Sequence, residues 1–136
     1  MPMIKVIAID HIVLRTSKIA EMKEFYSNIL NCPPERELLD LGLLQLRAGS
    51  ALIDLVPVDS ELGRLGGKAP NQDGRNMDHL CLQIDNVEDS ELLDYLERSG
   101  IKVEEFAERY GAEGLGRSLY INDPEGNIVE LKYSKK

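Results

Sequence analysis

The chain has 136 residues, of which 43% are hydrophobic and 29% charged, which is enough for one globular domain with its own core. Its formal net charge is −8, and no basic cluster reverses that sign, which argues against nucleic acid or an anionic membrane as a partner. No apolar run is long enough to span a membrane, and no charged leader precedes one, which predicts a cytoplasmic protein.

The first half of the chain predicts one strand, one helix and three further strands. Residues 6–15 predict a strand in which His11 and Arg15 share one face, because side chains alternate along an extended chain. A helix follows through residues 19–30, where apolar residues recur at helical spacing, and Pro33 ends it. Three short apolar runs then predict strands at about residues 35–40, 43–47 and 51–57.

The second half repeats this order after a polar segment rich in Gly and Pro. That segment indicates a connector or a functional loop. A strand, a helix and three strands follow, at about residues 78–84, 88–99, 103–108, 117–122 and 127–133. We therefore predict an α+β domain of two β-α-β-β-β modules that form a curved, partly open mixed sheet barrel around a metal cavity. Module 1 covers about residues 5–58, the connector 59–77 and module 2 about 78–133, within a single domain over 1–136.

The only two histidines occupy equivalent positions in this repeat. His11 and His79 each follow an aspartate and precede a short apolar run within a predicted strand. The last strand of each module is interrupted by one acid, Asp54 in the first and Glu130 in the second. A single histidine is more often a core or surface residue, but this repetition favours one shared site. Two imidazoles with one or two carboxylates are a ligand set for a divalent metal.

This arrangement resembles the vicinal oxygen chelate superfamily, which includes glyoxalase I, bleomycin- and fosfomycin-resistance proteins and extradiol dioxygenases. The resemblance extends nearly throughout the chain, and its most specific part is the strand–turn–strand phrase at residues 117–131. It implies that His11, His79 and Glu130 bind a divalent cation, one of Zn, Ni, Co, Mn or Fe(II). Asp54 matches the fourth ligand position, where it would bind directly, through water, or contact the substrate. In short members the site combines two subunits, which implies a homodimer.

The resemblance also implies residues for substrate binding. Arg15 matches an arginine that contacts the glutathione carboxylate in bacterial glyoxalase I, whereas Val58 stands where that enzyme has asparagine. The phrase that ends at Tyr120 resembles the Gly-x-Gly-Arg-Ser-x-Tyr phrase of fosfomycin-resistance enzymes, so Arg117 and Tyr120 are candidates for binding a polar or anionic substrate. Arg47 is a further candidate. Each of these side chains also suits the plain surface of a strand.

The leading functional hypothesis is a metal-dependent lyase or isomerase of the glyoxalase I type, acting on a small-molecule substrate. In it a carboxylate, Glu130 or Asp54, moves a proton while the metal stabilises charge on neighbouring substrate oxygens. The alternatives are a fosfomycin-type resistance enzyme, an extradiol-type dioxygenase and a non-catalytic drug-binding resistance protein. Dioxygenases of this group usually have longer chains, and pure binders often lose the histidines.

Overall fold

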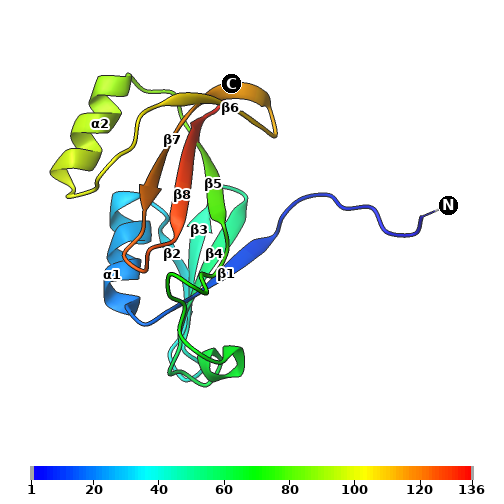
Figure 1. The fold of residues 1–136 in the computed structure, drawn as a ribbon. Helices are drawn as coiled ribbons and strands as arrows, with labels where there is room; N and C mark the ends of the chain where they lie inside the picture. The colour runs from blue at the N-terminus through cyan, green and yellow to red at the C-terminus, as the bar shows by residue number, and fades with distance from the viewer. Residues whose placement is uncertain (1, 136) are drawn as a thin grey trace. The chain divides into compact units, whose positions relative to one another are not determined.

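A computed structural model describes residues 2–135, and the chain divides into two compact units, Met1–Ala69 and Pro70–Lys136. Each unit contains one four-stranded mixed sheet and a helical segment (Figure 1). The predicted α+β class with a repeated module is therefore confirmed. Neither sheet closes on itself, and the boundary between the units lies inside the predicted connector at residues 59–77.

Unit 1 has the strand order β1-β4-β3-β2, with β1 parallel to β4 and the other pairs antiparallel. The parallel pair requires a long crossover, which the helical segment and the β2–β3 hairpin supply. Leu14, Ile53 and Leu55 are almost fully buried on one face of this sheet. The elements are β1 (His11–Thr16), α1 (Ile19–Lys23), the π-helical η1 (Glu24–Ile29), β2 (Pro34–Leu38), β3 (Leu43–Ala48), β4 (Ala51–Pro57) and the 3₁₀-helical η2 (Gly63–Gly66).

Unit 2 repeats this topology with the strand order β5-β8-β7-β6, in which β5 and β8 are parallel. Its core contains Leu96 of the helix and Leu119, Val129 and Leu131 of the sheet, all buried. The amphipathic helix thus covers one face of the sheet and leaves the other for polar side chains. The elements are β5 (His79–Ile84), α2 (Asp89–Arg98), β6 (Ala107–Gly111), β7 (Gly114–Asn122) and β8 (Ile128–Tyr133).

Two strand predictions were wrong at their boundaries by four residues or more, and the strand predicted over 117–122 begins earlier, at Gly114. The strand predicted over residues 6–15 begins only at His11, and the apolar side chains before it are exposed, including Ile7 at 94%. The reason is pairing: β1 runs parallel to β4, and the register of His11 with Leu52 leaves no residue of β4 opposite residues 6–9. The strand predicted over 103–108 instead occupies Ala107–Gly111, because the tight hairpin into β7 sets its register.

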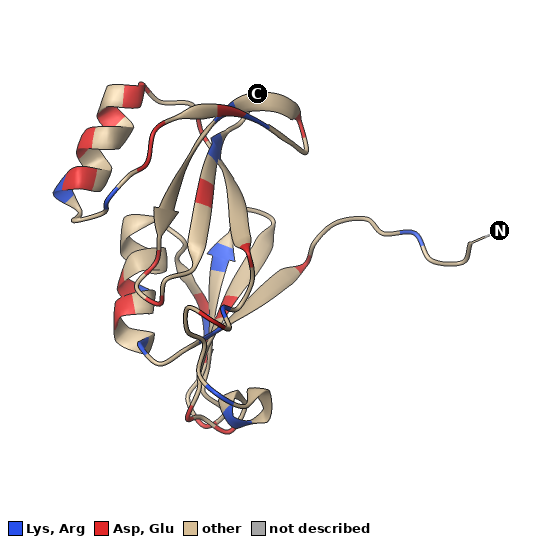
Figure 2. Cartoon of the chain, viewed as in Figure 1, with Lys and Arg blue, Asp and Glu red and all other residues tan. Residues whose placement is uncertain are grey.

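Acidic residues lie along α2 and at many positions of both units, in keeping with the net charge of −8 (Figure 2). Over residues 2–135, neither α-helix combines the length and the apolar character that crossing a membrane requires.

Candidate functional site

In unit 2, strand pairing places the predicted acid in the middle of a polar row. Glu130 of β8 lies opposite Cys81 of β5 on one side and opposite Tyr120 of β7 on the other. Directly opposed residues project from the same face of a sheet, so these three side chains are neighbours. His79 lies in the adjacent row, opposite Ile128. The β-pairing therefore brings together three residues that the sequence predicted for the site: His79, Tyr120 and Glu130.

The two oxygens of the Glu130 carboxylate have different partners. Glu130 is only 5% exposed, and the Ser118 hydroxyl donates a hydrogen bond to its Oε2 at 2.7 Å. Its Oε1 lies 3.3 Å from Nε2 of His79. On the other side of the ring, Nδ1 of His79 lies 2.6 Å from Oδ2 of Asp78, and this hydrogen bond lowers the pKa of Asp78. Both ring nitrogens of His79 thus face a carboxylate oxygen.

A ring with a carboxylate at each nitrogen is suited to holding a cation. When Nδ1 donates its proton to Asp78, Nε2 presents a lone pair toward Glu130 Oε1, and two lone pairs repel each other. A second proton on His79 or a cation bound by both atoms removes this repulsion. A carboxylate that fixes Nδ1 while Nε2 binds metal is the usual arrangement around a ligating histidine. The donor chemistry of unit 2 therefore fits half of a mixed nitrogen and oxygen site.

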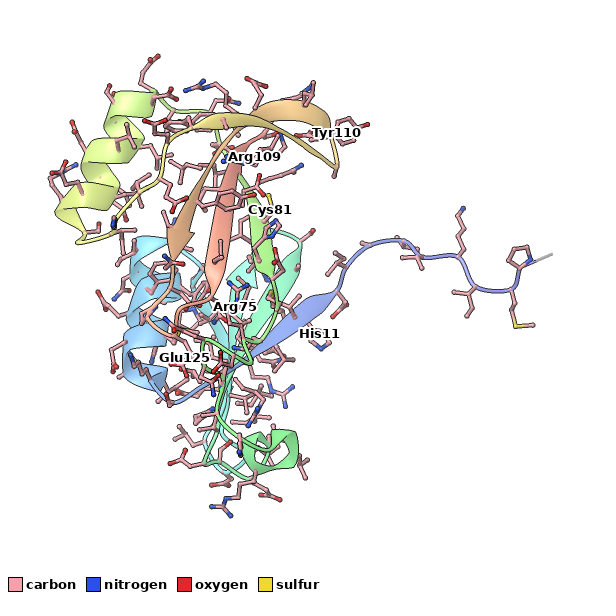
Figure 3. The ribbon with its side chains drawn as sticks, in the orientation of Figure 1. His11, Arg75, Cys81, Arg109, Tyr110 and Glu125 are labelled. Carbon is pink, nitrogen blue, oxygen red and sulfur yellow. The ribbon has the colours of Figure 1, made fainter. Side chains whose placement is uncertain are left out.

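Aromatic and cationic groups surround this pair. The Tyr120 ring lies edge-to-face with His79 at 5.6 Å between centroids, and the Arg109 guanidinium lies 4.2 Å from the centre of the Tyr120 ring. Burial, with the nearby Glu130 charge, raises the pKa of Tyr120, so its phenol stays protonated at neutral pH. Burial likewise raises the pKa of Cys81 to about 11, which keeps this thiol neutral (Figure 3 labels Cys81 and Arg109).

A half-open cavity of about 310 Å³ adjoins these residues. Its wall includes His79 and Tyr120, together with Lys102, Glu104 and Asn122, which the sequence analysis did not single out. This volume is at the lower end of the range that small-molecule sites occupy. A small polar compound is thus the kind of ligand that fits beside His79.

Unit 1 also has an Asp-His pair and a buried acid on its last strand, but the partners of that acid differ. Nδ1 of His11 lies 2.7 Å from Oδ1 of Asp10; this hydrogen bond, and then the charge of Asp54, raises the pKa of His11. Asp54 is 3% exposed and lies opposite Val13 on one side and Gln45 on the other. The Gln45 side-chain amide donates to both Asp54 oxygens at 3.2 Å. The structure therefore gives Asp54 an amide partner where Glu130 has a hydroxyl and an imidazole.

The three predicted arginines have structural partners. Arg15 donates to the carbonyl oxygens of Gly63, Gly67 and Lys68, and so holds the loop after β4. Arg47 forms a 2.8 Å ion pair with Glu35 at the surface. These contacts use donors that the sequence analysis assigned to a substrate.

Arg117 and Tyr120 lie on opposite faces of β7, because they are an odd number of positions apart on one strand, with Ser118 and Leu119 between them. Asp89 at the start of α2 forms an ion pair with Arg117, whose guanidinium lies 4.8 Å from the centre of the Phe106 ring. The two residues of the fosfomycin-type phrase therefore do not share one wall. Tyr120 lies on the Glu130 face and Arg117 on the α2 face.

Sequence reasoning missed the side chains that support the acids. Ser118 had a detectable signal, because it lies two residues from Tyr120 on a strand that was predicted. Arg109 fell just beyond the strand predicted over 103–108, and Gln45 carried no charge to draw notice. Over residues 2–135, no three His, Cys, Asp or Glu side chains come close enough to hold a metal ion by themselves.

Comparisons with known proteins agree with the fold. The family described as the Glyoxalase/Bleomycin resistance protein/Dioxygenase superfamily matches residues 8–131. A virulence protein of Salmonella typhimurium is 28% identical over 129 residues, which cover 90% of this chain and 81% of that protein. Its crystal structure aligns with a TM-score of 0.73 at 25% identity, over 96% of this chain and 98% of that chain.

Two further solved structures share the fold. An integron cassette protein of Vibrio cholerae aligns with a TM-score of 0.74 at 24% identity, over 98% of this chain and 99% of that one. A mutant of the fosfomycin resistance protein FosX of Listeria monocytogenes, complexed with Mn(II) and 1S,2S-dihydroxypropylphosphonic acid, aligns with a TM-score of 0.67 at 20% identity. That alignment covers 94% of this chain and 90% of the FosX chain.

Proposed function

Since the chain belongs to the glyoxalase/bleomycin resistance protein/dioxygenase superfamily, we propose that it is a divalent-metal-dependent lyase or isomerase of the glyoxalase I type. The observation that carries this proposal is the pair formed by His79 and Glu130, whose Nε2 and Oε1 lie 3.3 Å apart while Asp78 occupies the other ring nitrogen. We propose that His11, His79 and Glu130 bind the cation. Asp54 is the fourth residue of the set and its second acid.

This proposal gives Asp54 and Tyr120 separate chemical roles beside the cation. A divalent cation, when bound, supplies Lewis acidity to two neighbouring substrate oxygens. Asp54, held by the Gln45 amide, takes a proton from the carbon that bears the hydroxyl group of the substrate and returns it to the adjacent carbonyl carbon. The hydroxyl proton passes to the former carbonyl oxygen, so the hydroxyl and carbonyl groups exchange places. No atom is gained or lost, so the reaction is an isomerisation. Tyr120 keeps its proton and donates a hydrogen bond to a substrate oxygen.

The first test uses metal and turnover together. Protein purified without added metal is analysed for bound metal, then loaded with Ni, Co, Zn or Mn and given the hemithioacetal of methylglyoxal and glutathione. We expect thioester formation with at least one metal, and loss of both metal and turnover in His11→Ala and His79→Ala. Absence of turnover with all four metals contradicts the lyase proposal. Metal retained in both variants contradicts the ligand set.

We also propose that the protein works as a homodimer in which His11 of one subunit joins His79 and Glu130 of the other. The test mixes two inactive variants, His11→Ala and Glu130→Ala, under conditions that exchange subunits. A site shared between subunits regains one intact ligand set in each mixed dimer, so activity and metal binding return. If all ligands of a site come from one subunit, every site in the mixed dimer lacks a ligand, and activity stays absent.

A second candidate is the opening of an electrophilic antibiotic of the fosfomycin type. The specific observation is that Tyr120, which ends the phrase Gly-Leu-Gly-Arg-Ser-Leu-Tyr, lies opposite Glu130 in a chain that shares its fold with FosX. Phosphorus NMR of fosfomycin incubated with Mn-loaded protein, with water or a thiol as nucleophile, distinguishes this reaction from the first. An unchanged fosfomycin spectrum, with unchanged drug sensitivity on overexpression, excludes it.

A further inference from the structure

Arg109 and Ser118 form a directed hydrogen-bond chain behind Glu130. Nη1 of Arg109 donates to the Ser118 carbonyl oxygen at 2.7 Å and to the Ser118 hydroxyl at 3.0 Å. A guanidinium group has donors only, so the hydroxyl accepts from Arg109 and keeps its single proton for another partner. That partner is Oε2 of Glu130, at 2.7 Å. Arg109 thus dictates which way the Ser118 hydroxyl points.

These hydrogen bonds meet at a buried serine, and two glycines leave space for a lysine that supports them. Ser118 is 0% exposed, and Lys132, which is 4% exposed, donates from Nζ to the Arg109 carbonyl oxygen at 2.8 Å. The Lys132 side chain passes over Gly111 and Gly116, where an added Cβ would come within 2.8 Å and 2.6 Å of it. Two glycines therefore leave the space that this lysine needs. Hydrogen bonds to charged groups are strong in such surroundings, where water competes little.

The first unit lacks this support. On β3, the position two residues before Gln45 is Leu43, whereas on β7 the position two residues before Tyr120 is Ser118. Asp54 consequently has an amide partner and no hydroxyl from that row. The two acids thus differ in their hydrogen-bond donors: Glu130, which also contacts His79, accepts from a hydroxyl held by Arg109, whereas Asp54 accepts from the Gln45 amide.

We propose that Arg109 is a positioning residue that acts through Ser118 on Glu130. By binding Oε2, Ser118 fixes the carboxylate so that Oε1 faces Nε2 of His79, which are the two atoms that would hold a divalent cation. The inference rests on the proposed function in taking Glu130 as a cation ligand. Arg109 needs no contact with substrate for this role.

Calorimetric titration of the full-length protein with Mn(II) tests whether the contacts from Arg109 through Ser118 to Glu130 support cation binding. Arg109→Gln and Ser118→Ala are expected to weaken Mn(II) binding by about 10- to 100-fold, the usual effect of losing a partner that orients a ligand. Ser118→Thr keeps the hydroxyl and is expected to restore most of the affinity. Arg117→Gln, on the other face of β7, is the matched control and leaves binding unchanged. The Co(II) absorption spectrum provides a second readout, which changes shape in Arg109→Gln.

The outcomes separate this inference from the proposed function. Wild-type affinity in a folded Arg109→Gln variant overturns it, as does a Ser118→Thr variant as weak as Ser118→Ala. If wild-type protein binds none of Ni, Co, Zn and Mn, the proposed function fails, and a double-mutant cycle on the metal-free protein still tests whether Arg109 acts on Glu130. Urea unfolding of Arg109→Gln, Glu130→Gln and the double variant then gives non-additive losses of unfolding free energy if Arg109 and Glu130 are coupled through Ser118. Additive losses overturn it.

Discussion

Replacing Asp123 with alanine is expected to be strongly destabilising, because this residue closes the turn between β7 and β8. It is 4% exposed, and its Oδ1 accepts the backbone N–H groups of Glu125 and Asn127, each at 2.9 Å. Its Oδ2 accepts the Asn127 side-chain amide at 2.8 Å. The same turn sets the register that places Tyr120 opposite Glu130.

The magnitude follows from which donors can reach water. The Glu125 N–H is partly buried and gains a water partner, whereas both bonds from the buried Asn127 are lost at full cost. Hydrogen bonds to charged groups contribute about 1.5–3 kcal/mol each, so we expect a loss of about 3–5 kcal/mol in Asp123→Ala. Since domains are stable by only about 5–15 kcal/mol, this is a large part of the total.

Urea unfolding followed by circular dichroism measures this loss. With a slope of about 2 kcal/mol per molar urea, the midpoint of Asp123→Ala is expected to fall by about 1.5–2.5 M. Asp123→Asn keeps the Oδ1 acceptor but turns an amide toward the Asn127 amide, so its loss should be about 1–2 kcal/mol. An alanine variant within about 1 kcal/mol of wild type refutes the reasoning, as does an asparagine variant that is equally damaged.

Three further predictions concern packing, pH and the α2 face. Gly63→Ala places a Cβ 1.8 Å from the backbone oxygen of Pro57, so the backbone must move and thermal unfolding should occur at least about 5 °C lower. Burial, with the hydrogen bond to Asp89, raises the pKa of Tyr133 to about 12. The stability that this contact contributes is complete below the pKa of an unfolded tyrosine, near 10, and is lost as the pH rises through 12. Because the pKa of Tyr120 is also raised, an ultraviolet titration of Tyr133→Phe is expected to show one fewer late-ionising phenol than the wild type. Arg117→Gln loses a partly exposed ion pair and should cost about 1 kcal/mol or less in unfolding free energy, with turnover unchanged.

Each of these predictions has a control within the chain. Gly74→Ala meets its nearest atom only at 3.9 Å and should leave the unfolding temperature unchanged. Tyr110 is 81% exposed, so Tyr110→Phe should not change the number of late-ionising phenols. A fall in turnover in Arg117→Gln as large as that in Arg109→Gln would contradict the assignment of the two faces of β7.

The elements that sequence predicted well are those whose own residues determine them. The strand predicted over residues 51–57 matches β4 (Ala51–Pro57), because Ile53 and Leu55 alternate with residues of the other face between two turn signals. The apolar run at residues 6–9 shows the opposite case. Its side chains suit a strand, but a strand needs a partner, and β4 does not extend to it.

The candidate site also contains residues that their own type signals and contacts that depend on strand pairing. His11, His79, Asp54 and Glu130 could be proposed from the sequence, because a repeated histidine with a trailing acid is a signal in residue types alone; their role in the site stays a prediction. The supporting contacts depend on strand register across a hairpin. Arg109 reaches Ser118 only because β6 pairs with β7 from the Gly111–Gly114 closure onward, which no local pattern announced.

Both histidines occupy the terminal strand of their own sheets, His11 on β1 and His79 on β5. A terminal strand has backbone hydrogen bonds to one neighbour in its sheet and opens more readily than a central one. A cation held by His79 and Glu130 would cross-link β5 to β8 and make that opening more costly. Amide hydrogen exchange in β5 should therefore slow on cation binding, so the occupancy of the site sets how firmly this edge of the sheet is held.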